Sequence, residues 1–269
     1  MKKISARMWA TLILIGFVGQ LAWTIENMYF NVFLYNTIST DPRHISAMVG
    51  WSAAAATLTT LLMGALSDRV GKRKLFICGG YILWGASTAA FGLITVENAA
   101  RLFPAVQATT AAAAMVVVLD CVMTFFGSTA NDAAFNAYIT DAVDSENRGK
   151  TESVLAVLPL IAMLVIFGAF DGMTQRGEWQ RFFAIFGALV TLAGVAGIFL
   201  IKEPDISPRH EPHTAQRAVS QKSGLRPAPL GRAGACGALS GICGVLRVLR
   251  RGAGLFSISH HLYPELSET

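Results

Sequence analysis

Charged residues are scarce in this sequence: they make up 14% of its 269 residues, whereas apolar residues make up 53%. This balance excludes an ordinary soluble domain and indicates a membrane protein. The formal charge of +5 is not a nucleic-acid footprint, because residues 1–204 hold 14 Lys and Arg against 13 Asp and Glu. We therefore expect membrane lipid as a partner and no nucleic acid.

Cysteines and catalytic motifs are also few. The four cysteines, at positions 78, 121, 236 and 243, show no ligand spacing, so we predict neither a disulfide nor a zinc site. The sequence shows no nucleophile triad, phosphate-binding loop or metal-ligand cluster. We expect no enzymatic activity, no metal and no cofactor other than a coupling cation.

Six long apolar runs are the main feature that is present. A helix needs about 20 apolar residues to cross the hydrocarbon of a bilayer, and we predict spans over 9–35, 45–66, 75–95, 106–137, 154–170 and 181–201. Only helices or closed barrels satisfy their backbones in lipid. The predicted fold class is an all-α membrane protein, with a six-helix bundle over 1–204 and an irregular cytoplasmic tail over 205–269.

Basic residues alternate between the connections of these runs. Ten Lys and Arg precede the first run, follow the sixth, or lie between the second and third or the fourth and fifth. The remaining connections hold four. Because basic residues collect in cytoplasmic segments, we expect both ends of the bundle in the cytoplasm.

Polar side chains interrupt two of the runs. They are Glu26, Asn27 and Asn31 in the first run, and Asp120, Asn131 and Asp132 in the fourth. A carboxylate at the bilayer centre costs about 3 kcal/mol, so it should face a cavity or a partner. We predict a solute- or ion-binding site from these residues, with Asp120 and Asn131 on one helix face. The alternatives are hydration of Glu26 near the interface and a structural hydrogen bond from the fourth run.

A glycine-flanked charged stretch, 64–74, joins the second and third runs. It resembles the signature G-x-L-[SA]-D-R-x-G-[RK]-[RK] of the major facilitator superfamily. The resemblance implies the first half of a twelve-helix transporter fold. We expect a short hairpin here in which Gly64 permits close helix approach and Gly71 supplies a left-handed turn. The gating residues that the hairpin contributes are Gly64, Asp68, Arg69, Gly71 and Arg73.

A second charged loop, 141–152, resembles the family's loop between helices 4 and 5. By this resemblance Arg148 pairs with Asp68 and stabilises one state of the transport cycle. Within the superfamily the chain is most similar to the glycoside–pentoside–hexuronide:cation symporters, the melibiose permease branch. That likeness implies a small-solute or sugar symporter of the bacterial inner membrane and favours Asp132 as the mid-membrane acid, whereas apolar content favours Asp120. Those symporters coordinate sodium partly through acids of helix 2, and the second run holds no acid. The resemblance therefore leaves open sodium, a proton or no coupling ion at all.

The character of the sequence changes after residue 204, where proline, histidine and glycine replace the apolar periodicity. We expect a transporter truncated to its first half, with a tail translated out of frame. The alternative is a non-transporting remnant or a half-protein that works with a second half-transporter chain.

Overall fold

The computed structural model describes residues 4–203, and every regular element in that range is a helix. Six helical spans are long and apolar enough to cross a membrane, which confirms the predicted fold class. These spans are Ala6–Ile38, Pro42–Val70, Arg73–Leu93, Ala108–Ala142, Ser145–Ala169 and Trp179–Leu200. The expected irregular, out-of-frame tail lies outside the described residues.

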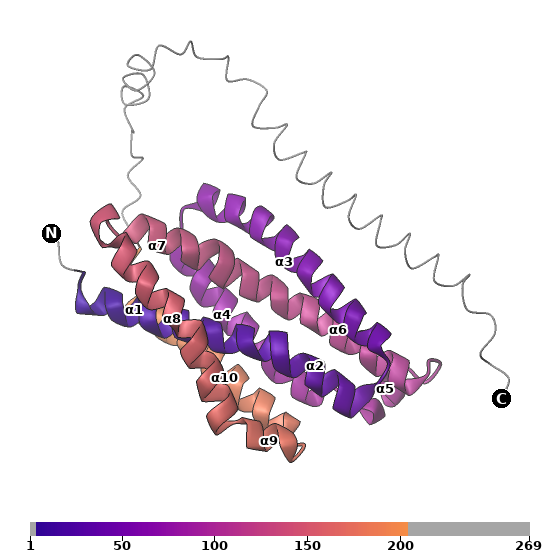
Figure 1. The fold of residues 1–269 in the computed structure, drawn as a ribbon. Helices are drawn as coiled ribbons and strands as arrows, with labels where there is room; N and C mark the ends of the chain where they lie inside the picture. The colour runs from indigo at the N-terminus through magenta and orange to yellow at the C-terminus, as the bar shows by residue number, and fades with distance from the viewer. Residues whose placement is uncertain (1–3, 204–269) are drawn as a thin grey trace, which may run out of the picture. The chain divides into compact units, whose positions relative to one another are not determined.

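Several spans consist of more than one element. The elements are α1 (Ala6–Thr24), η1 (Ile25–Tyr29), α2 (Phe30–Phe33), η2 (Leu34–Ile38), α3 (Pro42–Val70), α4 (Arg73–Ala90), η3 (Phe91–Leu93), α5 (Val96–Leu102), α6 (Ala108–Gly127), η4 (Ser128–Phe135), α7 (Asn136–Ala142), α8 (Ser145–Ala169), α9 (Asp171–Gln175) and α10 (Trp179–Leu200). Here η1, η2 and η4 are π-helical and η3 is a 3-10 turn. In Figure 1 the long helices lie side by side, with α3 alongside α6.

The turn between α3 and α4 is shorter than the hairpin that the sequence predicts. The helix α3 continues to Val70, and Gly71 ends it with a φ of 68°, a left-handed conformation that glycine adopts without strain. Because α4 begins at Arg73, only two residues lie outside the helices. The predicted left-handed turn at Gly71 is present.

The closest helix packing joins α4 to α10. A Cβ atom on Gly187 would lie 2.6 Å from the backbone oxygen of Gly85, and one on Gly194 would lie 3.0 Å from the backbone oxygen of Cys78. Small residues let two backbones approach closely, and the van der Waals packing that results favours helix association in lipid. Aromatic rings fill the core beside this contact, where Phe30 lies 4.0 Å from Phe91 between ring centroids.

The packing predicted at Gly64 is wrong, and so is the loop predicted after the fourth span. Gly64 has no atom within 4 Å of the place where a Cβ would be, so it does not mediate a close approach. Gly50 likewise has open space where a Cβ would be, and within α3 only Met48, Thr59 and Ser67 are buried. The loop predicted over 141–152 is mostly helical, because α8 begins at Ser145 with Asp144 before it in an extended conformation.

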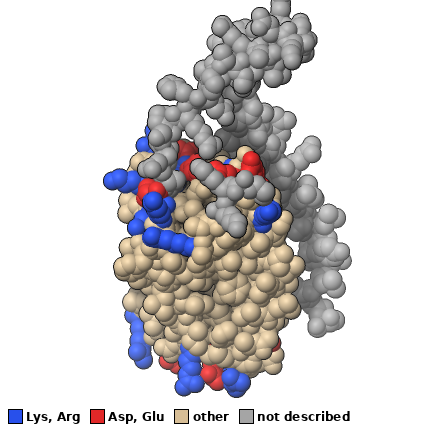
Figure 2. All heavy atoms as spheres, turned by 90° about the vertical axis from the view of Figure 1, so that its left-hand side faces the viewer, with Lys and Arg blue, Asp and Glu red and all other residues tan. Residues whose placement is uncertain are grey.

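Charged side chains gather at the two ends of the bundle. On the face shown in Figure 2, Lys, Arg, Asp and Glu lie at the top and bottom, and an uncharged band separates them. Exposed apolar side chains such as Leu62, Leu164 and Phe199 are normal in such a band, because lipid covers it.

Candidate functional site

A cavity of about 270 Å³ lies between the first, second and fourth spans. Glu26 and Asp120 both line it, although they come from different spans, and their side chains are buried, with 8% and 2% of the residue exposed. The other lining residues are Trp23, Asn27, Asn31, Met48, Val49, Ser52, Ala53 and Ala56. The structure thus brings together four of the six residues predicted for a solute or ion site.

Hydroxyl groups hold one oxygen of Glu26. The Thr124 hydroxyl donates to Glu26 Oε1 at 2.7 Å, and the Ser52 hydroxyl donates to the same oxygen at 3.1 Å. Ser52 and Thr124 are themselves 2.7 Å apart. Three spans therefore meet at one carboxylate oxygen. Sequence reasoning missed both hydroxyls, because serine and threonine in apolar helices commonly bond only to their own backbone.

One carboxylate oxygen of each of these two acids lacks a hydrogen-bond partner. Glu26 Oε2 and Asp120 Oδ1 are buried without a hydrogen-bond partner among the described residues. No Lys or Arg is among the residues that line the cavity. A buried carboxylate without a basic partner requires a proton or a cation from elsewhere, so the cavity is suited to hold positive charge.

The polar stretch of the first span is π-helical. Residues Ile25–Tyr29 form η1, in which backbone bonds reach one residue further than in an α-helix. The Asn27 side-chain amide donates to the Trp23 carbonyl at 2.8 Å, and that of Asn31 donates to the Asn27 carbonyl at 2.9 Å. These amides stabilise the irregular backbone, while Asn31 Oδ1 remains buried and unpartnered among the described residues.

Asn131 and Asp132 lie away from this cavity. The Tyr81 hydroxyl contacts Asn131 Oδ1 at 3.1 Å and the Ile15 carbonyl at 2.7 Å, and the Asn131 amide lies 3.5 Å from Asp132 Oδ1. Neither residue lines the Glu26 cavity. Asn131 lies in the π-helix η4, eleven residues beyond Asp120, and contacts Tyr81 instead of the cavity.

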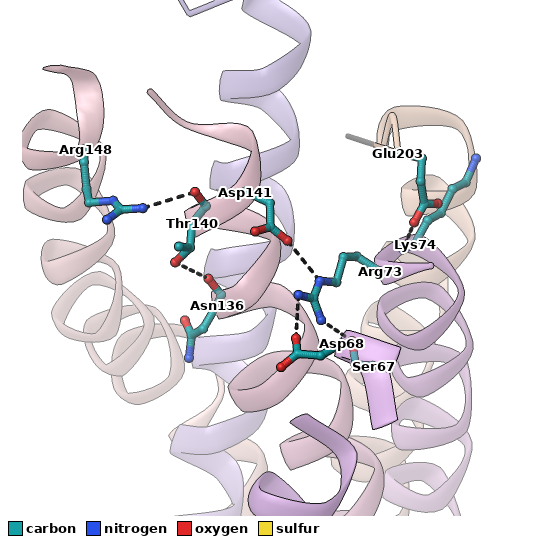
Figure 3. A network of polar contacts seen from close by, with 9 residues as sticks. All are labelled: Ser67, Asp68, Arg73, Lys74, Asn136, Thr140, Asp141, Arg148 and Glu203. Carbon is teal, nitrogen blue, oxygen red and sulfur yellow. Dashed lines mark hydrogen bonds and ion pairs between the residues drawn. The ribbon is translucent and has the colours of Figure 1, made fainter. Parts of the chain in front are cut away.

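The charged hairpin centres on Arg73, as Figure 3 shows. Its guanidinium contacts Asp68 at 2.6 Å and Asp141 at 3.1 Å, and it donates to the Ser67 hydroxyl at 2.7 Å. Only 7% of Arg73 is exposed. The planar fork of arginine can serve three acceptors at once, so this residue fastens the second, third and fourth spans together. No sequence pattern singles out Asp141, which is one of four acids in the charged stretch 141–152.

The predicted pair between Asp68 and Arg148 does not form. Arg148 donates to the Thr140 carbonyl at 3.1 Å, while Arg73 occupies Asp68. The prediction failed because α8 begins before Arg148 and holds it beside the end of α7. Arg69 is exposed and makes no ion pair with any described carboxylate.

Six apolar spans with charged ends define a multi-pass helical membrane protein. A family model described as the Major Facilitator Superfamily matches residues 12–260, a range that continues beyond the described residues. The chain therefore belongs to the major facilitator superfamily of membrane transporters. No curated protein and no solved structure matched the chain in the corresponding comparisons.

Proposed function

We propose that the protein is a secondary transporter that moves a small solute together with a cation through the cavity of Glu26 and Asp120. The observation that carries this proposal is a pair of buried acids, Glu26 and Asp120, that line one cavity without a basic side chain and each have one carboxylate oxygen without a hydrogen-bond partner. A proton or sodium ion at this pair would neutralise the buried charge. Hydroxyl, amide and tryptophan side chains around the acids suit a sugar, which is our first candidate for the solute.

The proposed location is the bacterial inner membrane, with both ends of the bundle in the cytoplasm. The positive excess at the end that carries Arg73 supports this orientation. Transporters of this superfamily bind solute between two six-helix halves. The described residues supply one six-helix unit, so we propose that a second such unit, on a partner chain, completes the pathway.

Uptake into proteoliposomes tests the solute site. The full chain is reconstituted alone or with a candidate second half, and labelled sugars are supplied under a proton or a sodium gradient. We expect Glu26→Gln and Asp120→Asn each to lower gradient-driven uptake about tenfold or more, because an amide cannot hold a cation in the carboxylate's place. Glu146→Gln, which changes an exposed acid in the first turn of α8, is the matched control and should leave uptake unchanged.

Binding can be measured apart from transport. Trp23 lines the cavity, and its ring lies 5.1 Å from that of Trp84. Solute or cation entry should change tryptophan fluorescence in the parent protein, and Trp23→Phe should abolish the change. Full uptake by both Glu26→Gln and Asp120→Asn would contradict the proposal. If the chain alone shows the fluorescence change but no uptake, and a second half restores uptake, the protein is a half-transporter that needs a partner chain.

A further inference from the structure

A second and larger hollow lies on the outside of the bundle, at the end opposite Arg73. It has a volume of about 840 Å³ and is bounded by the end of the third span, by α5 and by α6. None of its lining residues lines the Glu26 cavity. Most of the lining side chains are apolar, and Leu93, Leu102 and Val118 are each more than 60% exposed. The groove is therefore an apolar surface that the described part of the chain leaves uncovered.

The length of the groove matches one leaflet of a bilayer. Along α6 the lining runs from Thr110 to Val122. At 1.5 Å per residue this distance is about 18 Å, and one leaflet contributes about 15 Å of hydrocarbon. An extended acyl chain that enters near Thr110 would reach the middle of the membrane at Val122.

A cation lies at the outer end of the groove. Arg101 is in the last turn of α5, a short helix that connects two spans and so lies at the level of the lipid headgroups. Its side chain is exposed, lines the groove and makes no ion pair with any described carboxylate. Asn98, one turn earlier, lines the same end and uses its amide on the Leu93 carbonyl. The groove thus has a cation at its outer end, where a phospholipid headgroup would lie, and an apolar surface further in, where an acyl chain would lie.

We propose that this groove binds one phospholipid, with its phosphate at Arg101 and one acyl chain along α6 as far as Val122. A guanidinium suits this position because it forms strong, directional hydrogen bonds with phosphate oxygens. The proposal concerns a face of the bundle that is separate from the solute cavity and does not depend on which solute is carried.

Native mass spectrometry of the full chain in mild detergent tests the proposal, with phosphatidylglycerol as the probe. Two variants alter the two parts of the groove: Arg101→Gln removes the cation, and Ala114→Trp fills the apolar channel. Each has a control outside the groove. Arg43→Gln removes an exposed cation near the start of α3, at the same end of the bundle, and Ala54→Trp adds a ring on the exposed side of α3.

We expect the parent protein to retain one phosphatidylglycerol molecule more tightly than any other lipid molecule that stays bound in the detergent. Arg101→Gln should weaken that binding about fivefold, since one basic residue near a membrane surface contributes about that much, and Ala114→Trp should abolish it. Both controls should bind as the parent does. Diacylglycerol, which has the chains but no phosphate, should bind the parent no better than it binds Arg101→Gln, and inorganic phosphate should not compete.

Three results would overturn the proposal. Equal losses in Arg101→Gln and Arg43→Gln would mean general surface attraction, and competition by inorganic phosphate would mean an anion site without a lipid. A change in oligomeric mass in Ala114→Trp, with lipid retention unaltered, would mean that a second copy of the chain covers the groove. Thermal unfolding of all four variants verifies that lost binding is not lost folding.

Discussion

Among the basic residues of the hairpin, the structure separates one from the others. Positions 69, 72, 73 and 74 all carry Lys or Arg, and in the sequence they are equivalent markers of a cytoplasmic loop. Only Arg73 turns inward, where it contacts Asp68, Asp141 and Ser67. The choice depends on Asp141, which is distant in sequence, so no local pattern could have revealed it.

Replacement of Arg73 should destabilise the bundle. We expect Arg73→Ala to lower the free energy of unfolding by about 2 kcal/mol, less than for a fully buried pair because both aspartates are partly exposed. Arg73→Lys should lose most of the same amount, since one ammonium cannot reach three acceptors. The measurement is unfolding by SDS titration of the purified protein.

Lys150→Ala, at an exposed position of α8, is the control and should stay within about 0.5 kcal/mol of the parent. Equal stability of Arg73→Ala and Lys150→Ala would show that the ion pairs of Arg73 contribute nothing measurable to the fold.

At the scale of a helix, the glycines of α4 fall into two classes that look identical in the sequence. A Cβ on Gly85 would meet the backbone oxygen of Gly187 at 2.5 Å, whereas Gly79 has nothing within 4 Å. From the sequence alone, both glycines are expected to favour close packing against a neighbouring helix. Which of them faces α10 depends on how the two helices cross, and this is a property of the pair.

Alanine substitutions should separate the two classes. We expect Gly85→Ala to destabilise by about 1–3 kcal/mol, because backbone atoms of α10 must move apart. Gly79→Ala should be neutral or stabilising by up to about 1 kcal/mol, because alanine is the better helix former and has room. SDS unfolding of both proteins measures the difference, and a loss in Gly79→Ala as large as that in Gly85→Ala would rule out the packing described here.

The π-helical segments are the other element-scale feature that the sequence could not supply. Asn27 and Asn31 attract notice as polar residues at helical spacing, but the pattern gives no sign that their amides bond to backbone carbonyls. An asparagine that binds solute and one that stabilises an irregular helix look the same in a sequence. Likewise, Asp120 lines the cavity from α6, whereas Asn131 lies in η4 and contacts Tyr81.

At the scale of the whole molecule, apolar length and charge alternation were sufficient to predict the six spans, because hydrocarbon thickness imposes both. The pairing of Glu26 with Asp120 in one cavity could be predicted only in part from the sequence. Both acids stood out as expensive in lipid, but their proximity depends on how the first and fourth spans pack. The partners Ser52 and Thr124 carried no signal at all.

The contacts at one end of the bundle predict which segments lie on the same side of the membrane. Arg73 contacts Asp141, and Arg148 contacts Thr140, so the α3–α4 turn and the start of α8 lie at the same end of the bundle. In a chain whose native cysteines are replaced by serine, Lys72→Cys and Lys150→Cys should react with a membrane-impermeant thiol reagent from the same side of sealed vesicles. Labelling from opposite sides would be incompatible with this fold.

The long helix α3 carries Ser52 in the cavity and Asp68 in the ion pair with Arg73. Fifteen residues of uninterrupted α-helix lie between them, which puts them about 24 Å apart along the axis. Between these two contacts α3 runs as one helix without a break from Pro42 to Val70, so displacements at its two ends are coupled. A rigid tilt of α3 that parts Ser52 from Glu26 would also move Asp68 relative to Arg73, so a change at the cavity would be felt at the ion pair on the end of the bundle.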